Sequence, residues 1–115
     1  MRPEVKKFLW DAHSAATRVA LFVAGKSLDD YLRDDLLRSG VERQLEIVGE
    51  ACNQVSRLDA ETGARIPELA RLVAFRNILA HAYADLDHRL VWDLVQKKLP
   101  LLASVLERLL NESER

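Results

Sequence analysis

The sequence contains few residues that interrupt or cross-link a fold. Its 115 residues include four glycines, three prolines and one cysteine. So little glycine and proline is unusual for a β-protein with many tight turns and favours long helices. The lone Cys52 excludes an intramolecular disulfide and a cysteine-based zinc finger. The length is typical of one domain and suffices to bury a core, so we expect a single helical domain over residues 1–115.

A strong excess of charge and long apolar runs are also missing. The 17 basic and 18 acidic residues leave a formal net charge of −1, so a nucleic-acid ligand would need a local binding site. No apolar run approaches the roughly 18 residues of a membrane-spanning helix. Residues 1–10 carry charges throughout and lack the apolar centre of a signal peptide. We therefore expect a soluble, cytoplasmic protein that has no contact with a membrane.

The sequence does contain apolar residues that recur every three to four positions, which is the period of amphipathic helices. Four long helices are predicted, with a short capped turn after the first and a kink or split at Pro100 in the last. The predicted helical ranges are 3–23, 34–58, 66–82 and 87–110, with the capped turn at 27–32, a break at 59–63 and a loop at 85–87. Such helices with short connections predict an all-α fold, a four- to five-helix antiparallel bundle.

Two kinds of residue predict how these helices pack. Gly40 and Gly49 lie inside the second helix, where each costs about 1 kcal/mol relative to alanine. Close approach of a neighbouring helix is the preferred explanation, and a hinge is the alternative. Trp10 and Trp92 are expected to be packing residues. Several helices, notably the last, are apolar over more than one stripe, which favours a partner surface or a homodimer.

Acidic and histidine side chains can border a functional site or bind a metal ion. Glu42, Glu46 and Glu50 recur every four residues and form a ridge along the second helix. The ridge is either a solvated face, or part of it borders a cleft and orders Arg76. The paired Glu-x-x-His motifs of di-iron bundles are absent, so no metal site is predicted. His13 has no second ligand at a metal spacing and is interpreted as structural or surface.

The polar residues of the third helix carry the candidate chemistry. Asn77 and His81 are four residues apart and share a helix face, and Arg76 and Tyr83 are seven apart and share a neighbouring face. Arg76 and His81 differ by about 140° around an ideal helix. A long arginine side chain spans only part of that angle, and a second chain could supply the missing convergence.

These residue types are suited to RNA cleavage. Histidine exchanges a proton near neutral pH, and arginine binds phosphate through its planar fork. With Asn77 as a further donor and no metal ligand, the set suits transesterification by the ribose 2′-OH, with His81 as general base or acid and Arg76 stabilising charge on phosphorus. On the pattern alone a structural role is preferred, in which Arg76 pairs with an acidic residue and His81 caps the helix end.

The stretch Arg76-Asn77-Ile78-Leu79-Ala80-His81-Ala82-Tyr83 resembles the signature of the HEPN superfamily, and specifically its HepT-type toxin family. That signature is Arg, usually followed by Asn, Asp or His, and then His after four to six intervening residues. HepT-type members add a Tyr two residues after the His. Residues 41–51 resemble the second-helix segment of the family, and residues 87–92 and 99–102 resemble its C-terminal part. The resemblance runs from near residue 3 to near residue 110.

The resemblance implies a metal-independent endoribonuclease, the toxin of a toxin–antitoxin pair, which needs no cofactor and cleaves single-stranded RNA. Arg76, Asn77 and His81 of two chains would face one cleft of a homodimer. The implied partner is a small nucleotidyltransferase antitoxin that attaches AMP from ATP to Tyr83 and thereby blocks RNA. The alternatives are an inactive HEPN module that binds a nucleotide or a partner nucleotidyltransferase, and a plain helical dimerisation domain. The intact motif favours the enzyme.

Overall fold

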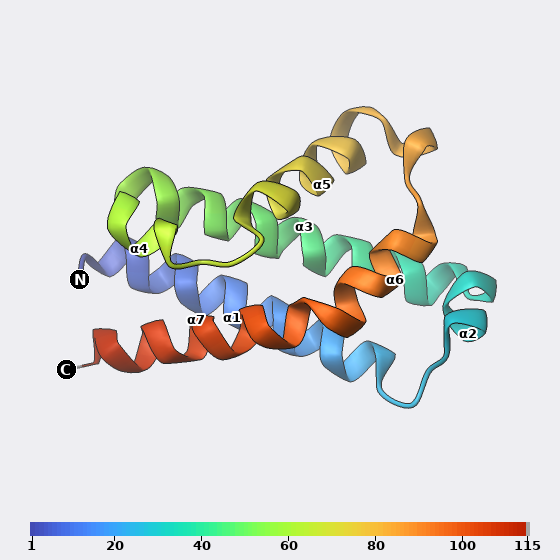
Figure 1. Cartoon of the computed structure of the whole chain (residues 1–115), viewed down its shortest axis with the longest axis horizontal. Helices are drawn as coiled ribbons and strands as arrows, with labels where there is room; N and C mark the ends of the chain where they lie inside the picture. Colours follow the sequence, from blue (N-terminus) through green and yellow to red (C-terminus); the bar gives the residue numbers. More distant parts are fainter. Residues whose placement is uncertain (115) are drawn as a thin grey trace.

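The computed structural model describes residues 1–114, which fold into helices without a strand. The elements are α1 (Pro3–Val23), α2 (Leu28–Arg33), α3 (Asp35–Leu58), α4 (Ala60–Ala64), α5 (Leu69–His81), η1 (Tyr83–Asp85, a 3₁₀ turn), α6 (His88–Lys97) and α7 (Leu99–Ser113). The long helices α1, α3 and α5 and the pair α6–α7 alternate in direction, and both termini lie at one end (Figure 1). The predicted all-α antiparallel bundle is confirmed. Within residues 1–114, no helix is long and apolar enough to cross a membrane.

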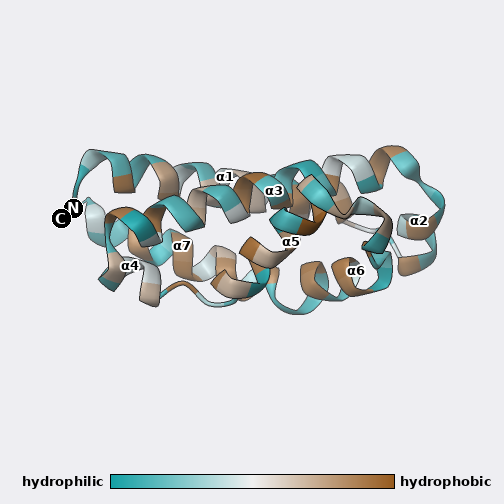
Figure 2. Ribbon diagram, turned by 90° about the horizontal axis from the view of Figure 1, so that it is seen from above, coloured by the Kyte–Doolittle hydropathy of each residue, from teal (hydrophilic) through white to brown (hydrophobic). Residues whose placement is uncertain are grey.

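Helix α1 lies between α3 and α7, and α5 packs on the other side of α3 (Figure 1). Hydrophilic and hydrophobic residues alternate along α1 and α3, as expected for amphipathic helices (Figure 2). Their apolar faces form one continuous core, to which α1, α3 and α7 contribute most. The buried Tyr31 of α2 packs on the half-buried Trp92 of α6, with ring centroids 5.3 Å apart, so the packing role expected for Trp92 is confirmed.

The helix ends follow local rules that the sequence reveals. Ser27 and Asp30 form a reciprocal capping box at α2, with hydrogen bonds of 2.9 and 3.1 Å. Asp34 caps α3, and Asp87 caps α6. Pro100 lies in the first turn of α7, where its missing N–H leaves no bond unmade, and the chain therefore splits into α6 and α7. The predicted kink or split at Pro100 is confirmed.

Two predicted boundaries are wrong for local reasons. The break at 59–63 contains the short helix α4, because Asp59 caps its amide and hydroxyl donors at Thr62. The third helix begins at Leu69 rather than at Ile66–Pro67, because Glu68 adopts a left-handed conformation with φ of 63°.

Gly49 is where α5 approaches α3 most closely. A Cβ atom built there would lie 2.9 Å from the backbone oxygen of Leu72 and 3.6 Å from Cβ of Arg76. At Gly40, a Cβ would meet only the ring of Phe22, at 3.3 Å. The interpretation of close helix approach is thus confirmed, and at Gly49 it determines where the backbone of Arg76 lies. The expectation for Trp10 is wrong, because its side chain is 60% exposed on the outer face of α1.

Candidate active site

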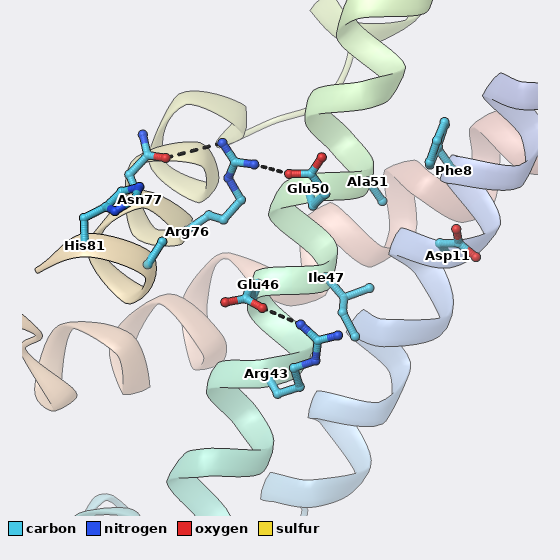
Figure 3. A pocket seen from close by; sticks show the side chains of 11 residues that line it. Phe8, Asp11, Arg43, Glu46, Ile47, Glu50, Ala51, Arg76, Asn77 and His81 are labelled. Carbon is cyan, nitrogen blue, oxygen red and sulfur yellow. Dashed lines mark hydrogen bonds and ion pairs between the residues drawn. The ribbon is translucent and has the colours of Figure 1, made fainter. Parts of the chain in front are cut away.

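The three motif residues of α5 open onto one hollow between α5, α3 and α1. The hollow has a volume of about 410 Å³, and its walls combine apolar side chains with charged ones (Figure 3). Its lining residues are Phe8 and Asp11 from α1, Arg43, Glu46, Ile47, Glu50 and Ala51 from α3, and Arg76, Asn77, Ala80 and His81 from α5. Although Arg76 and His81 project at different angles, both therefore contribute to one surface within a single chain.

The guanidinium of Arg76 is held between two neighbours. Nη1 donates to Oε2 of Glu50 on α3, and Nη2 donates to Oδ1 of Asn77 at 3.3 Å (Figure 3). The buried Nε has no hydrogen-bond partner among the described residues. Glu50 also accepts from Gln54 at 3.0 Å, and the hydrogen bond from Gln54 together with the charge of Arg76 lowers the pKa of the Glu50 carboxyl. Glu50 is thus ionised at neutral pH and keeps the arginine fork in place.

His81 is the last residue of α5, and its side chain is exposed to solvent. In Figure 3 its ring lies beside Asn77, on the same side of the hollow. No hydrogen bond or ion pair engages its ring nitrogens within residues 1–114. Either nitrogen is therefore open to a ligand that enters the hollow.

Part of the acidic ridge of α3 borders this site. This agrees with the second interpretation of the ridge, in which part of it borders a cleft and orders Arg76. Glu50 pairs with Arg76, and Glu46 lines the hollow while it pairs with Arg43. Glu42 does not line the hollow and is buried. Arg43 is a wall residue that the sequence analysis did not identify. Its spacing of seven residues from Glu50 places both on the same face of α3 and was the available signal.

Tyr83 lies outside the hollow, and one expectation about it is wrong. It does not continue the helix face of Arg76, because α5 ends at His81 and Tyr83 begins the turn η1. Its side chain is 53% exposed, and its hydroxyl donates to Oε1 of Glu42 at 3.0 Å. That hydrogen bond raises the pKa of the Tyr83 phenol, with smaller contributions from partial burial and the Glu42 charge. The phenol is thus protonated at neutral pH and reachable from solvent.

The second oxygen of Glu42 faces a histidine. Oε2 lies 3.8 Å from Nδ1 of His88, the first residue of α6, and neither atom has a hydrogen-bond partner in the described part of the chain. Residues from α3, η1 and α6 therefore meet at Glu42. Sequence spacing cannot reveal this meeting, because the residues are separated by some forty positions. Among residues 1–114, no group of three or more His, Cys, Asp or Glu side chains is placed to hold a metal ion.

Comparison with known proteins gives several relatives of similar length. The protein named "Probable ribonuclease HepT" from Thermococcus cleftensis is 34% identical over 113 residues, covering 95% of this chain and 98% of the relative. A protein named "Putative RNase" from Methanocaldococcus jannaschii is 31% identical over 104 residues, covering 90% and 94%. Another protein of that name, from Caldanaerobacter subterraneus, is 26% identical over 113 residues, covering 98% and 96%. No solved structure matches the chain significantly.

The family profile described as "Ribonuclease HepT-like" matches residues 12–109, which include α3, α5 and every motif residue. The match covers most of the chain, and relatives above 30% identity align over nearly their whole length. The protein belongs to the HepT-like ribonuclease family of the HEPN superfamily.

Proposed function

We propose that the protein is an endoribonuclease toxin that cleaves single-stranded RNA without a metal ion, with Arg76, Asn77 and His81 as its catalytic residues. The observation that carries this proposal is that all three line one open hollow, where Glu50 and Asn77 orient the guanidinium of Arg76. Family membership supports RNA as the substrate class.

The chemistry is a transesterification within the RNA. The ribose 2′-oxygen attacks the adjacent phosphorus, and the 5′-oxygen of the next nucleotide leaves, which produces a 2′,3′-cyclic phosphate. His81 removes the 2′-OH proton or protonates the leaving oxygen. Arg76 stabilises the negative charge that builds on the phosphoryl oxygens. The side-chain oxygen of Asn77 accepts from Arg76, and its side-chain NH₂ group can donate to the same phosphoryl oxygens.

Glu50 must share Arg76 with the substrate. Both side chains of this ion pair are partly exposed, at 29% and 44%, and such pairs contribute only about 0–1 kcal/mol. A phosphate that binds bidentately to the guanidinium can therefore displace Glu50 at little cost. The pair keeps Arg76 ordered while the site is empty.

We expect cleavage to persist in excess EDTA, because the proposed residues act through proton transfer and hydrogen bonding. The His81→Ala and Arg76→Ala variants should each cut RNA at least about a hundredfold more slowly than wild type. DNA of the same sequence should remain intact because it lacks the 2′-OH. The measurement is single-turnover cleavage of a labelled single-stranded RNA, with end-group analysis of the product.

The matched control is Arg71→Ala, which removes an arginine of the same helix whose side chain pairs with Glu68 outside the hollow. This variant should cleave like wild type. Loss of cleavage in EDTA, or wild-type rates for His81→Ala, would contradict the mechanism. If the unmodified wild type does not cut RNA, the inactive binding module becomes the better assignment.

We further propose that the active form is a homodimer in which the motif residues of the two chains line a shared cleft. Large apolar side chains remain exposed within residues 1–114, among them Trp10, Leu21, Leu90 and Leu101, and such surface favours self-association. Light scattering at micromolar concentration should give twice the chain mass of 13.1 kDa. A mass of one chain at all concentrations would contradict the shared cleft.

The proposed partner is a nucleotidyltransferase antitoxin that transfers AMP from ATP to Tyr83. The exposed phenol lies two residues beyond His81, so an attached adenylyl group would stand beside the hollow and obstruct RNA. Tyr31, the other tyrosine, is completely buried and should not react.

This assignment predicts a mass increase of one or more adenylyl groups on the peptide that contains Tyr83. The protein is incubated with a small nucleotidyltransferase of the antitoxin type, ATP and Mg²⁺, and the product is mapped by peptide mass spectrometry. Tyr83→Phe should escape modification and keep its cleavage activity. Adenylylation at Tyr31, or undiminished cleavage by fully modified protein, would refute the proposed neutralisation.

A further inference from the structure

The phenol of Tyr83 and the carboxylate of Glu42 form a hydrogen-bonded pair whose members differ in exposure to solvent. The oxygens are 3.0 Å apart, and the phenol donates a hydrogen bond to the carboxylate. The tyrosine side chain is 53% exposed, but that of Glu42 is only 8% exposed. A reagent can therefore approach the exposed tyrosine from solvent, while the carboxylate that accepts its hydrogen bond stays shielded.

Burial of the Glu42 carboxylate costs free energy unless its oxygens accept hydrogen bonds. A buried carboxylate that lacks partners for its lone pairs is destabilising, yet Oε2 has no hydrogen-bond partner within residues 1–114. His88 on α6 faces this oxygen across 3.8 Å. The other charged or titratable groups around the pair are the buried Tyr31 of α2 and the Arg38 and Asp35 side chains of α3. Of all these groups, Glu42 alone bonds the Tyr83 hydroxyl.

We propose that Glu42 is the general base that removes the proton of Tyr83 when AMP is transferred to it. This inference rests on the proposed modification of Tyr83. The phenolic oxygen forms a bond to the α-phosphorus of ATP, and the bond from that phosphorus to the pyrophosphate oxygen breaks. Pyrophosphate leaves with the electron pair, and the phenolic proton passes to Oε1 of Glu42. The acceptor protein thus supplies the base for its own modification.

His88 of α6 is the neighbour of the second oxygen of Glu42. Its Nδ1 lies 3.8 Å from Oε2, the oxygen that does not take the proton, and no hydrogen bond joins the two atoms. Because His88 begins α6 directly after its cap Asp87, its backbone position is well determined.

A purely structural bond would also join Tyr83 to Glu42, because it ties η1 to α3. The two roles differ in their effect on reactivity. A bond that only stabilises the protonated phenol makes Tyr83 less reactive than a free tyrosine, since its pKa is raised. A general base makes the protonated phenol react directly, and the rate then no longer depends on the small phenolate fraction.

The first experiment needs no partner protein. Tyr83 is acetylated with N-acetylimidazole, with N-acetyltyrosinamide in the same tube as the reference, and the rate is followed by peptide mass spectrometry from pH 6 to 8. In wild type, the Tyr83 rate should exceed the reference rate and change little with pH. Glu42→Gln retains an acceptor oxygen but not the base. At pH 7 its Tyr83 acetylation rate should be about a hundredfold below that of wild type, and this rate should increase about tenfold for each unit of pH.

The matched control is Asp35→Asn, which removes a carboxylate that acts on Tyr83 through its charge but bonds Arg38 instead. Its rate should stay near that of wild type. Thermal unfolding of each variant, followed by circular dichroism, verifies that the fold is intact. Equal acetylation rates and pH profiles for wild type and Glu42→Gln would overturn the role of Glu42 as a base.

The second experiment repeats the comparison with a small nucleotidyltransferase of the antitoxin type, ATP and Mg²⁺. The maximal rate of AMP transfer should fall about a hundredfold in Glu42→Gln, and KM for the acceptor protein should change little. Transfer at the wild-type rate would overturn the inference alone. Glu42-dependent acetylation without any AMP transfer to wild type would instead overturn the proposed modification and, with it, the transfer step.

Discussion

The close contact between α5 and α3 at Gly49 is the constraint on which the site depends. A Cβ atom at this position would lie 2.9 Å from a backbone oxygen of α5, so only glycine permits this separation of the helices. The next residue along α3 is Glu50, and the Cβ of Arg76 lies opposite Gly49. The contact therefore places arginine and glutamate within reach of each other, and the same approach forms one wall of the hollow.

Helix α3 serves two neighbouring sites through one row of glutamates. Glu50 holds Arg76 at the hollow, and Glu42, two turns earlier, holds Tyr83 outside it. Glu46 lies between them and pairs with Arg43. Glu50 and Glu42 differ in burial, and this difference gives them different roles. Glu50 is half-exposed and can yield Arg76 to a phosphate, whereas the buried Glu42 cannot exchange its partner for water and stays directed at the phenol.

Local rules explain how far the sequence predicted this structure. The capped turn at 27–32 and the split at Pro100 depend on neighbouring residues and were predicted correctly. The motif residues were identified from spacing and resemblance. The start of α5 was misplaced because a left-handed Glu68 has no clear sequence signal. Tyr83 was assigned the helix face of Arg76, but it follows the end of α5. Glu50 and Glu42, which bond Arg76 and Tyr83, lie on α3, and single-helix periodicity cannot assign contacts across helices.

The most direct test of this account is the single-turnover RNA cleavage rate of Gly49→Ala, compared with that of Gly40→Ala. The added methyl group at Gly49 must push α5 away from α3, and a displacement of about 1 Å in a catalytic group can cost about a hundredfold in rate. Gly40→Ala meets only the movable Phe22 ring and should cleave like wild type. The account predicts a loss of about ten- to a hundredfold for Gly49→Ala at a temperature where circular dichroism shows it folded. Cleavage by folded Gly49→Ala at the wild-type rate would contradict it.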